Sequence, residues 1–460
     1  MKPKDALLER WAQVLGRKGD APAVLNTSGG VERTFREIDE RARNFQLKVD
    51  AFEPRSVIAV QIGNHKDWPS ILIACFRREL VAVPLEQSIS EQQRDGALKV
   101  CRASAIVENE GDIRRIDNEP PTWGDNPPSL LKLTSGTTAE ARAIRFRSEQ
   151  LLADCEQICE TMGISDVDLN FGVIPISHSY GFSNLLTPLI ARGLPMVLSR
   201  DRTPRAVVED IVRTNATVFP GTPVFFQAFC EMEDVPPLPK LRLCISAGTP
   251  LPLVVAKNFR EKFGLPIHSF YGASECGGIC YDREDSSNIE GYVGAPMHDV
   301  DLEIVDPGAE ASQIRVRSAA AGDGYFPKPD QEKLGDGVFV PDDLLKLADG
   351  GFKIVGRVSD VINVAGKKVN PAEIEEALLQ FPGIRQAIAF GRPAVAGLRN
   401  EEVAACLVGD IDLRENAVLE YCRRRLSTWQ VPKRIFIVEA IPANERGKVS
   451  RRELAKRFSA

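Results

Sequence analysis

Hydroxyl side chains and a glycine gather in the run Leu133-Thr134-Ser135-Gly136-Thr137-Thr138, which ends an apolar stretch that begins at Leu130. A loop of this composition presents backbone N–H groups and hydroxyls together, and such a set can surround the oxygens of a polyphosphate. Arg142, nine residues after Leu133, supplies a cation that can neutralise charge there. The spacing of a Walker loop is missing. Taken alone, the run also fits a polar surface turn, so its interpretation depends on the segments that follow.

Two later segments at the ends of apolar runs also carry groups suited to nucleotide chemistry. His178 lies near Gly181 after a predicted strand, a place where ligands collect in doubly wound sheets. In the run Tyr271-Gly272-Ala273-Ser274-Glu275, the ring can stack on a base and the small residues allow close approach to the backbone. Glu275 can hold Mg²⁺ against phosphate. Each segment has a structural alternative: a helix-capping histidine, and a turn with a solvated glutamate.

Two further segments are charged. Asp343 follows another aspartate, and Arg357 lies fourteen residues later, so that a carboxylate for ribose hydroxyls and a guanidinium stand near each other in the sequence. Lys448 follows Gly447, twelve residues from the carboxyl end, and a single lysine there can deliver charge to an attacking carboxylate and a leaving phosphate. Surface Asp, Arg and Lys residues are common, so the alternative is a solvated face.

Helix and strand patterns alternate over the part of the chain that must position these residues. Amphipathic helices are expected at 35–47, 68–78, 148–162, 204–214 and 253–263, and apolar strands at 56–62, 80–85, 103–107, 170–176, 195–199, 217–219 and 241–246. Such alternation indicates crossover units and a mostly parallel sheet. After Gly291 the pattern changes to short strands with Gly, Asp and Pro turns, and a compact α+β pattern begins near Arg357.

We therefore expect an α/β fold. Its large N-terminal domain, residues 1–357, has doubly wound sheets plus a small β-barrel-like unit, and residues 358–460 form a smaller α+β C-terminal domain. The length of 460 residues agrees with more than one domain.

Composition excludes several classes of function. Lys and Arg number 58 against 64 Asp and Glu, a net charge of −6, which gives no basic face for nucleic acid. No run approaches the roughly 18–20 apolar residues of a membrane span. The amino end lacks an apolar signal core, so the ten cysteines are expected to be reduced thiols in a cytoplasmic protein. With four histidines and no His cluster, a zinc site is not expected.

Together and in this order, the five segments resemble the adenylate-forming superfamily of acyl-CoA synthetases, amino-acid adenylation domains and firefly-type luciferases. The resemblance covers essentially the whole chain, and its most specific parts are LTSGTT, YGASE, GRVSDVINVAGKKVNPAEIEEAL and PANERGKVSRREL. It implies that a small carboxylic acid attacks the α-phosphate of ATP to give an acyl-adenylate and pyrophosphate. The mobile C-terminal domain then rotates, and a thiol attacks the activated carbonyl.

The resemblance implies a role for individual residues. The β- and γ-phosphates of ATP are bound by Thr134, Ser135, Gly136, Thr137 and Thr138, with Arg142 keeping the charge of the family's usual lysine. The nucleotide is also bound by Gly248, Thr249, Tyr271 and Gly272, and its ribose by Asp343 with support from Arg357. The catalytic residues are Lys448, which bridges the acid and the phosphate, Glu275 on Mg²⁺, Ser274 near the α-phosphate, and His178 at the acyl pocket.

The chain departs from the family in places. Ala139, Ala141, Arg142 and Ala143 stand where the phosphate loop usually continues Gly-x-Pro-Lys-Gly. The residue before Glu275 is usually Thr and is here Ser274. The hinge position, where relatives often have Asp or Lys, is occupied by Ser359. The neighbouring Asp360 is expected to share the hinge role.

The resemblance also implies an acceptor and a class of acid. Gly366 would line a pantetheine tunnel, which requires a residue without a side chain and favours coenzyme A or the phosphopantetheine of a separate acyl carrier protein. The usual Asp for an α-ammonium group is missing, which favours an aryl or aliphatic acid. Walls of the acid pocket are expected from Ser179, Tyr180, Phe219, Gly221 and Ala247.

Three functions stay open at this point. The leading one is an acyl-CoA synthetase acting on a small-to-medium acid. The second is a stand-alone adenylating enzyme that loads a carrier protein or forms an amide. The third is a non-catalytic nucleotide-binding or scaffold protein.

Overall fold

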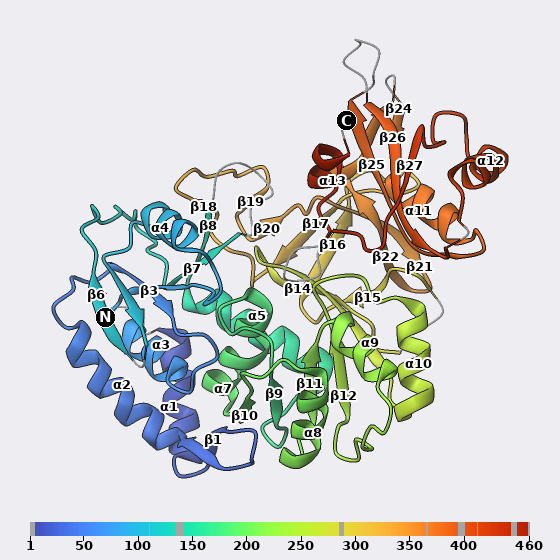
Figure 1. The fold of residues 1–460 in the computed structure, drawn as a ribbon. Coiled ribbons are helices and arrows are strands. Elements are labelled where there is room, and N and C mark those ends of the chain that lie inside the picture. Colours follow the sequence, from blue (N-terminus) through green and yellow to red (C-terminus); the bar gives the residue numbers. More distant parts are fainter. Residues whose placement is uncertain are drawn as a thin grey trace. The chain divides into compact units, whose positions relative to one another are not determined.

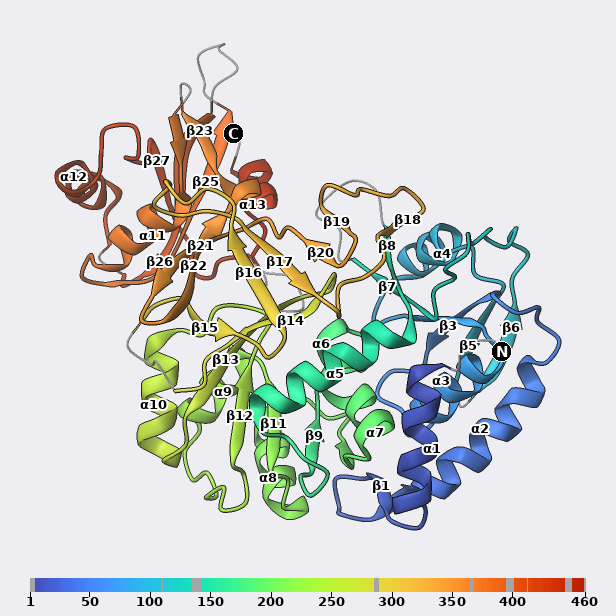
Figure 2. The same cartoon turned by 180° about the vertical axis from the view of Figure 1, so that it is seen from behind.

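The computed structural model describes residues 5–109, 111–134, 142–284, 289–364, 367–393, 401–411, 413–442 and 449–458. The chain divides into two compact units (Figures 1 and 2). The first unit comprises Met1–Glu303, Arg315–Pro341 and Ala348–Phe352. The second unit comprises Ile304–Ile314, Asp342–Leu347 and Lys353–Ala460.

One sheet of the first unit has seven strands in the order β18-β8-β7-β4-β3-β5-β6. The strands are β3 (Val57–Gln61), β4 (Val81–Pro84), β5 (Ala105–Glu108), β6 (Asp112–Arg115), β7 (Leu130–Leu133), β8 (Ala143–Phe146) and β18 (Tyr325–Phe326). The central strands β7, β4, β3 and β5 are parallel, and β8 and β6 run antiparallel to them. The central strands consist almost entirely of buried apolar residues, as expected for parallel strands covered on both faces.

The second sheet of the first unit contains the order β2-β1-β10-β9-β11-β12-β13-β14-β15. Its strands are β1 (Pro22–Leu25), β2 (Val31–Thr34), β9 (Asn170–Gly172), β10 (Met196–Leu198), β11 (Val218–Gly221), β12 (Leu243–Ser246), β13 (Ile267–Ala273), β14 (Gly277–Tyr281) and β15 (Tyr292–Pro296). Strands β1, β10, β9, β11, β12 and β13 are parallel, and β14 and β15 continue antiparallel. The expected doubly wound architecture is therefore confirmed.

Local capping signals explain the helices of the first unit: α1 (Ala6–Lys18), α2 (Phe35–Val49), α3 (Trp68–Arg77), α4 (Glu91–Val100), α5 (Ser148–Met162), α7 (Thr187–Arg192), α8 (Pro204–Thr214), α9 (Pro223–Glu231) and α10 (Leu253–Phe263). Helix α2 starts with a reciprocal capping box between Thr34 and Glu37. Helix α8 has Pro204 in its first turn and a left-handed Asn215 at its end. Helix α2 packs on α3, and α9 packs on α10 (Figure 1).

The predicted strand at 170–176 is wrong in its length. Strand β9 ends at Gly172, and the chain turns at Pro175, which lacks the N–H that a ladder would require. The short strands expected after Gly291 are confirmed as the sheet β16-β17-β20-β19. They are β16 (Val300–Ile304), β17 (Ile314–Ser318), β19 (Leu334–Gly335) and β20 (Val338–Phe339).

The second unit is α+β. It holds β23 (Ile362–Val364), β24 (Lys367–Val369), α11 (Pro371–Leu379), β25 (Ile384–Pro393), β26 (Glu401–Gly409), α12 (Glu415–Arg425), β27 (Arg434–Ile437) and α13 (Arg451–Arg457). Strands β25, β26 and β27 form one sheet, and α11 and α12 contribute Ile374, Leu378 and Val418 to its apolar core. Strands β21 (Asp343–Ala348) and β22 (Gly351–Arg357) are neighbours that cross the limits of the two units.

Three properties bear on the class of protein. No helix in the described part of the chain is long and apolar enough to cross a membrane. All ten cysteines are thiols outside any disulfide. Across the described ranges, no group of three or more His, Cys, Asp and Glu side chains is arranged to hold a metal ion.

Candidate active site

Predicted acid-pocket and adenine residues lie at the ends of the neighbouring parallel strands β11 and β12, and on β13, which extends beyond them. In the strand register, Gly221 of β11 lies beside Ser246 of β12, and Ser246 lies beside Ser269 of β13. The N–H of Ala247 donates to the carbonyl of Gly221 over 3.3 Å. Gly248 follows with φ of +93°, a backbone conformation that favours glycine. This edge is where ligands bind in open α/β sheets.

A short helix after β9 contacts this edge. His178 caps α6 (Ser179–Gly181), because its Nδ1 accepts a hydrogen bond from the N–H of Tyr180. The histidine thus has the helix-capping role that the sequence left open as an alternative. The chain continues as the π-helix η1 (Phe182–Leu186), a rare form that is frequent at functional sites. At Gly181 a Cβ would come within 2.0 Å of the Pro175 carbonyl oxygen, so this packing requires glycine.

Helix α6 brings two predicted pocket residues to the strand ends. The Ser179 Oγ donates to the Ser274 Oγ over 2.9 Å, and the Tyr180 hydroxyl donates to the Ile245 carbonyl over 3.3 Å. The ring centroid of Tyr180 lies 5.8 Å from that of Phe270. The residues predicted near the acid and near the α-phosphate are therefore adjacent.

Phe219 occupies a deeper position than its neighbours. Its side chain is fully buried, and its ring packs against four other phenylalanine rings, those of Phe171, Phe225, Phe226 and Phe229. A Cβ at Gly221 would come within 2.7 Å of the Phe219 ring. Phe219 is thus part of the core beneath Gly221, and its predicted part in the pocket wall stays a prediction.

Glu275 receives support from a residue that sequence reasoning missed. The Tyr325 hydroxyl donates to Glu275 Oε1 over 3.0 Å, and the Gly322 N–H donates to the Glu275 carbonyl over 2.9 Å. Burial raises the pKa of the Glu275 carboxyl, and the hydrogen bond from Tyr325 acts in the opposite direction. Tyr325 begins the two-residue strand β18, fifty residues after Glu275, and its surroundings have no periodic pattern. The sequence therefore gives no signal that pairs these two residues.

The base of the predicted phosphate loop is connected to the same tyrosine. Both the N–H and the hydroxyl of Thr134 donate to the Arg142 carbonyl, over 3.0 and 3.1 Å, and so close the β7–β8 hairpin. The Arg142 guanidinium lies 3.9 Å from the centre of the Tyr325 ring. Arg142, Tyr325 and Glu275 thus form a continuous chain of contacts. Ser135, Gly136, Thr137 and Thr138 lie outside the described residues.

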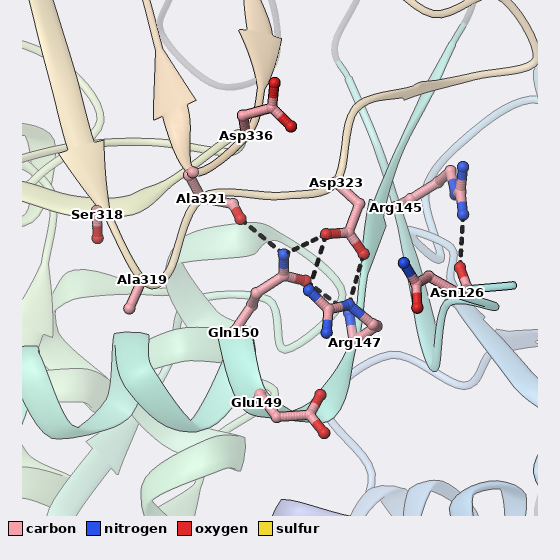
Figure 3. A pocket seen from close by; sticks show the side chains of 11 residues that line it. Asn126, Arg145, Arg147, Glu149, Gln150, Ser318, Ala319, Ala321, Asp323 and Asp336 are labelled. Carbon is pink, nitrogen blue, oxygen red and sulfur yellow. Dashed lines mark hydrogen bonds and ion pairs between the residues drawn. The ribbon is translucent and has the colours of Figure 1, made fainter.

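A hollow of about 510 Å³ adjoins this segment (Figure 3). Arg147 forms a two-pronged ion pair with Asp323, over 2.8 and 3.1 Å, and Gln150 Nε2 donates to Ala321 and Asp323 over 2.8 Å each. These contacts hold the segment that carries Gly322 and Tyr325. Of the predicted site residues that the structure describes, none lines the hollow.

The two predicted ribose-binding residues form a pair within the second unit. Arg357 Nε donates to Asp343 Oδ1 over 2.7 Å, and Asp343 is buried with 9% of its surface exposed. The Val358 N–H donates to the Asp342 carbonyl over 2.8 Å, which fixes β21 beside the end of β22. Gly366 and Lys448 lie outside the described residues.

Comparison with known proteins identifies the family. The family model described as AMP-binding enzyme matches residues 8–326, and the model of the AMP-binding enzyme C-terminal domain matches residues 373–448. The predicted boundary at 357/358 falls between these two matches and stays a prediction. A feruloyl-CoA synthase of an Amycolatopsis species is 25% identical over 469 residues, which cover 94% of this chain and 95% of the relative. A long-chain-fatty-acid–CoA ligase of Escherichia coli is 24% identical over 530 residues, covering 98% and 94%.

Solved structures share the fold. ATP-bound MatB from Rhodopseudomonas palustris superimposes with a TM-score of 0.85 at 20% identity, over 98% of both chains. The o-succinylbenzoate CoA synthetase of Bacillus subtilis, in complex with its acyl-adenylate intermediate, gives 0.82 at 22% identity over 97% of both chains. These identities establish the fold alone, whereas the AMP-binding model matches more than half of the sequence. The chain therefore belongs to the AMP-binding enzymes of the adenylate-forming superfamily and is an AMP-forming acid–thiol ligase.

Proposed function

We propose that this enzyme uses ATP and Mg²⁺ to convert a small aryl or aliphatic carboxylic acid to its acyl-adenylate, and then transfers the acyl group to the thiol of coenzyme A. The observation that carries the proposal is the chain of contacts from Arg142 through Tyr325 to Glu275. It joins the base of the hydroxyl-rich loop to the carboxylate expected near the phosphates. Ser274 precedes Glu275 in the sequence and accepts a hydrogen bond from Ser179.

The first step joins two anions, so positive charge must act at the reacting phosphate. Glu275 suits Mg²⁺ because it is an oxygen ligand whose ionised form loses hydration on burial, and a cation compensates that loss. Mg²⁺ is commonly held by one or two carboxylates plus substrate phosphates, so a single protein carboxylate such as Glu275 suits it. When bound, the ion neutralises charge on the phosphates. Thr134 and Arg142 would hold the phosphate end of the nucleotide.

The acid pocket is proposed to lie between α6 and the ends of β11 and β12. The Tyr180 hydroxyl donates to Ile245 of β12, and Ser179 donates to Ser274, the residue after β13. Ala247 and Gly221 present small or absent side chains at the ends of β12 and β11. The names of the relatives include both an aryl and an aliphatic acid, so both classes belong in the test. Both of these relatives are named for coenzyme A, which supports coenzyme A as the acceptor.

The test is ATP–pyrophosphate exchange with a panel of aryl and aliphatic acids, followed by detection of thioester after addition of coenzyme A. We expect exchange with at least one acid, and loss of about 10²–10³ in rate for Glu275→Gln. Glu149→Gln, which removes an exposed carboxylate in the same unit, serves as the matched control. Exchange without a CoA thioester would favour a separate carrier protein. Absence of exchange with every acid would refute the proposal.

A further inference from the structure

Arg451 is the first residue of α13 and follows the predicted catalytic Lys448 by three positions. Its guanidinium makes four close polar contacts. Nη1 lies 2.6 Å from Asp360 Oδ2, and Nη2 lies 2.8 and 3.0 Å from the two carboxylate oxygens of Glu375. Nε donates to the Ala389 carbonyl over 3.0 Å. Such a planar, multiply bonded guanidinium has one orientation, which a lysine could not reproduce.

The three partners come from three different segments of the second unit. Asp360 ends the 3₁₀ turn η2 (Val358–Asp360), through which the chain passes from β22 towards the hairpin β23–β24. Glu375 lies on α11 and also accepts the Ala389 N–H over 2.8 Å. Ala389 belongs to β25. Arg451 therefore ties the start of α13 to the turn that precedes the hairpin, to a helix and to the sheet.

The residues beside Arg451 fix the chain that leads back towards Lys448. Ser450 caps α13 by accepting the Glu453 N–H over 3.3 Å. Val449 packs against the apolar cluster that contains Phe390, Cys406 and Leu454. The backbone is thus anchored from the residue directly after Lys448. Arg451 supplies the charged part of this anchor, and its cation favours the ionised form of the partly buried Glu375 carboxylate.

We propose that Arg451 is a positioning residue for Lys448: it anchors Val449 and Ser450, the residues that follow Lys448 in the sequence, and joins them to Asp360 in the predicted hinge. The inference rests on the proposed function, because it requires Lys448 to act in adenylation. A displacement of about 1 Å in a reacting group can cost about 10² in rate. Release of Arg451 should therefore slow adenylation although the guanidinium itself touches no substrate.

The experiment is a double-mutant cycle with two readouts. Arg451→Met, Lys448→Ala and the double variant are compared in ATP–pyrophosphate exchange and in thioester formation from supplied acyl-adenylate. We expect Arg451→Met to lower exchange about 10²-fold when Lys448 is present and less than about twofold when it is absent, with thioester formation unchanged. Arg451→Lys should recover part of the exchange. Lys456→Met, an exposed charge on the same helix, is the control and should leave both readouts unchanged.

Several outcomes would overturn the inference: an equal loss of exchange in both backgrounds, equal loss of both half-reactions, or no loss at all. Should Arg451→Met not fold, Glu375→Gln removes the charge of one partner and is expected to give the same pattern more weakly. If Lys448→Ala leaves exchange intact, the proposed role of the lysine fails and the inference fails with it. If Lys448→Ala lowers exchange and Arg451→Met does not, only the inference fails.

Discussion

Replacing Tyr325 by Phe removes one oxygen atom and tests the link between the phosphate loop and the carboxylate. The Tyr325 hydroxyl donates to Glu275 Oε1 over 3.0 Å, and the tyrosine is 2% exposed. Burial already raises the pKa of Glu275, and this hydrogen bond favours the ionised form. Loss of this hydrogen bond must raise the pKa of Glu275 further, because the bond stabilises the ionised carboxylate more than the protonated one.

The magnitude follows from the energy of one hydrogen bond to a charged group, about 1.5–3 kcal/mol. At about 1.4 kcal/mol for each factor of ten, the ionisation of Glu275 becomes roughly 10–150-fold less favourable. Mg²⁺ requires the ionised carboxylate. As the pH is lowered at limiting Mg²⁺, the variant should therefore lose activity at a higher pH than the wild type. The acidic limb of the pH profile should move by one pH unit for each 1.4 kcal/mol or so.

The assay is ATP–pyrophosphate exchange as a function of pH, at limiting and at saturating Mg²⁺. We expect the acidic limb of Tyr325→Phe to move towards neutral pH at limiting Mg²⁺, and the difference to shrink as Mg²⁺ saturates. Tyr292→Phe is the control, since that hydroxyl donates to the Asp349 carbonyl on an exposed part of the same unit. An unchanged acidic limb in Tyr325→Phe, or an equal shift in the control, would refute the assignment of Glu275 to the metal.

Three further predictions concern other parts of the fold. Asp343→Asn should raise the KM for ATP roughly 10–100-fold in the exchange assay through loss of a charged hydrogen bond to ribose, and an unchanged KM would contradict that role. Lys132 is 5% exposed between the rings of Phe146 and Phe182, and burial lowers its pKa. In the unfolded chain Lys132 keeps its proton to a higher pH than in the folded protein. The free energy of unfolding of the wild type should therefore rise with pH in the alkaline range below the ordinary lysine pKa. Lys132→Met should abolish that rise, as measured by urea unfolding at a series of alkaline pH values; a rise that persists in the variant would contradict it. Gly272→Ala should lower the melting temperature, since its Cβ would come within 2.6 Å of the Gly277 carbonyl oxygen, and unchanged melting would show that the backbone can yield there.

Capping residues made several helices predictable from the sequence. The expected helices at 148–162, 204–214 and 253–263 have the observed bounds, because left-handed Gly163, Asn215 and Gly264 end them. The helical segment from Ser179 to Arg192 was not predicted. It is buried on nearly all sides, and its buried residues include the polar Ser183, Asn184 and Thr187, so no amphipathic period marks it.

Within the site, the sequence could indicate residues that lie in short contiguous runs. Ser274 and Glu275 follow β13, which runs parallel to β11 and β12, so their place towards the same side of the sheet as Gly221 and Ala247 could be expected. The residues that hold this part of the site in place could not be predicted. Arg147 meets Asp323 across 176 positions, and Tyr325 meets Glu275 across fifty. No local period or cap records contacts over such separations.

The long-range contacts also give the arginine of the altered phosphate loop a structural role. Where relatives have lysine, Arg142 places a planar guanidinium on the Tyr325 ring and lies 3.7 Å from Asp330. A guanidinium stacks on an aromatic face while keeping its charge, whereas an ammonium is a compact and strongly hydrated point charge. In this chain the cation at the loop's end therefore also supports the tyrosine that orients Glu275. Arg142, which departs from the family pattern, thus connects the loop to the Glu275 carboxylate through Tyr325. A substitution of either Arg142 or Tyr325 should therefore alter the position of the other side chain.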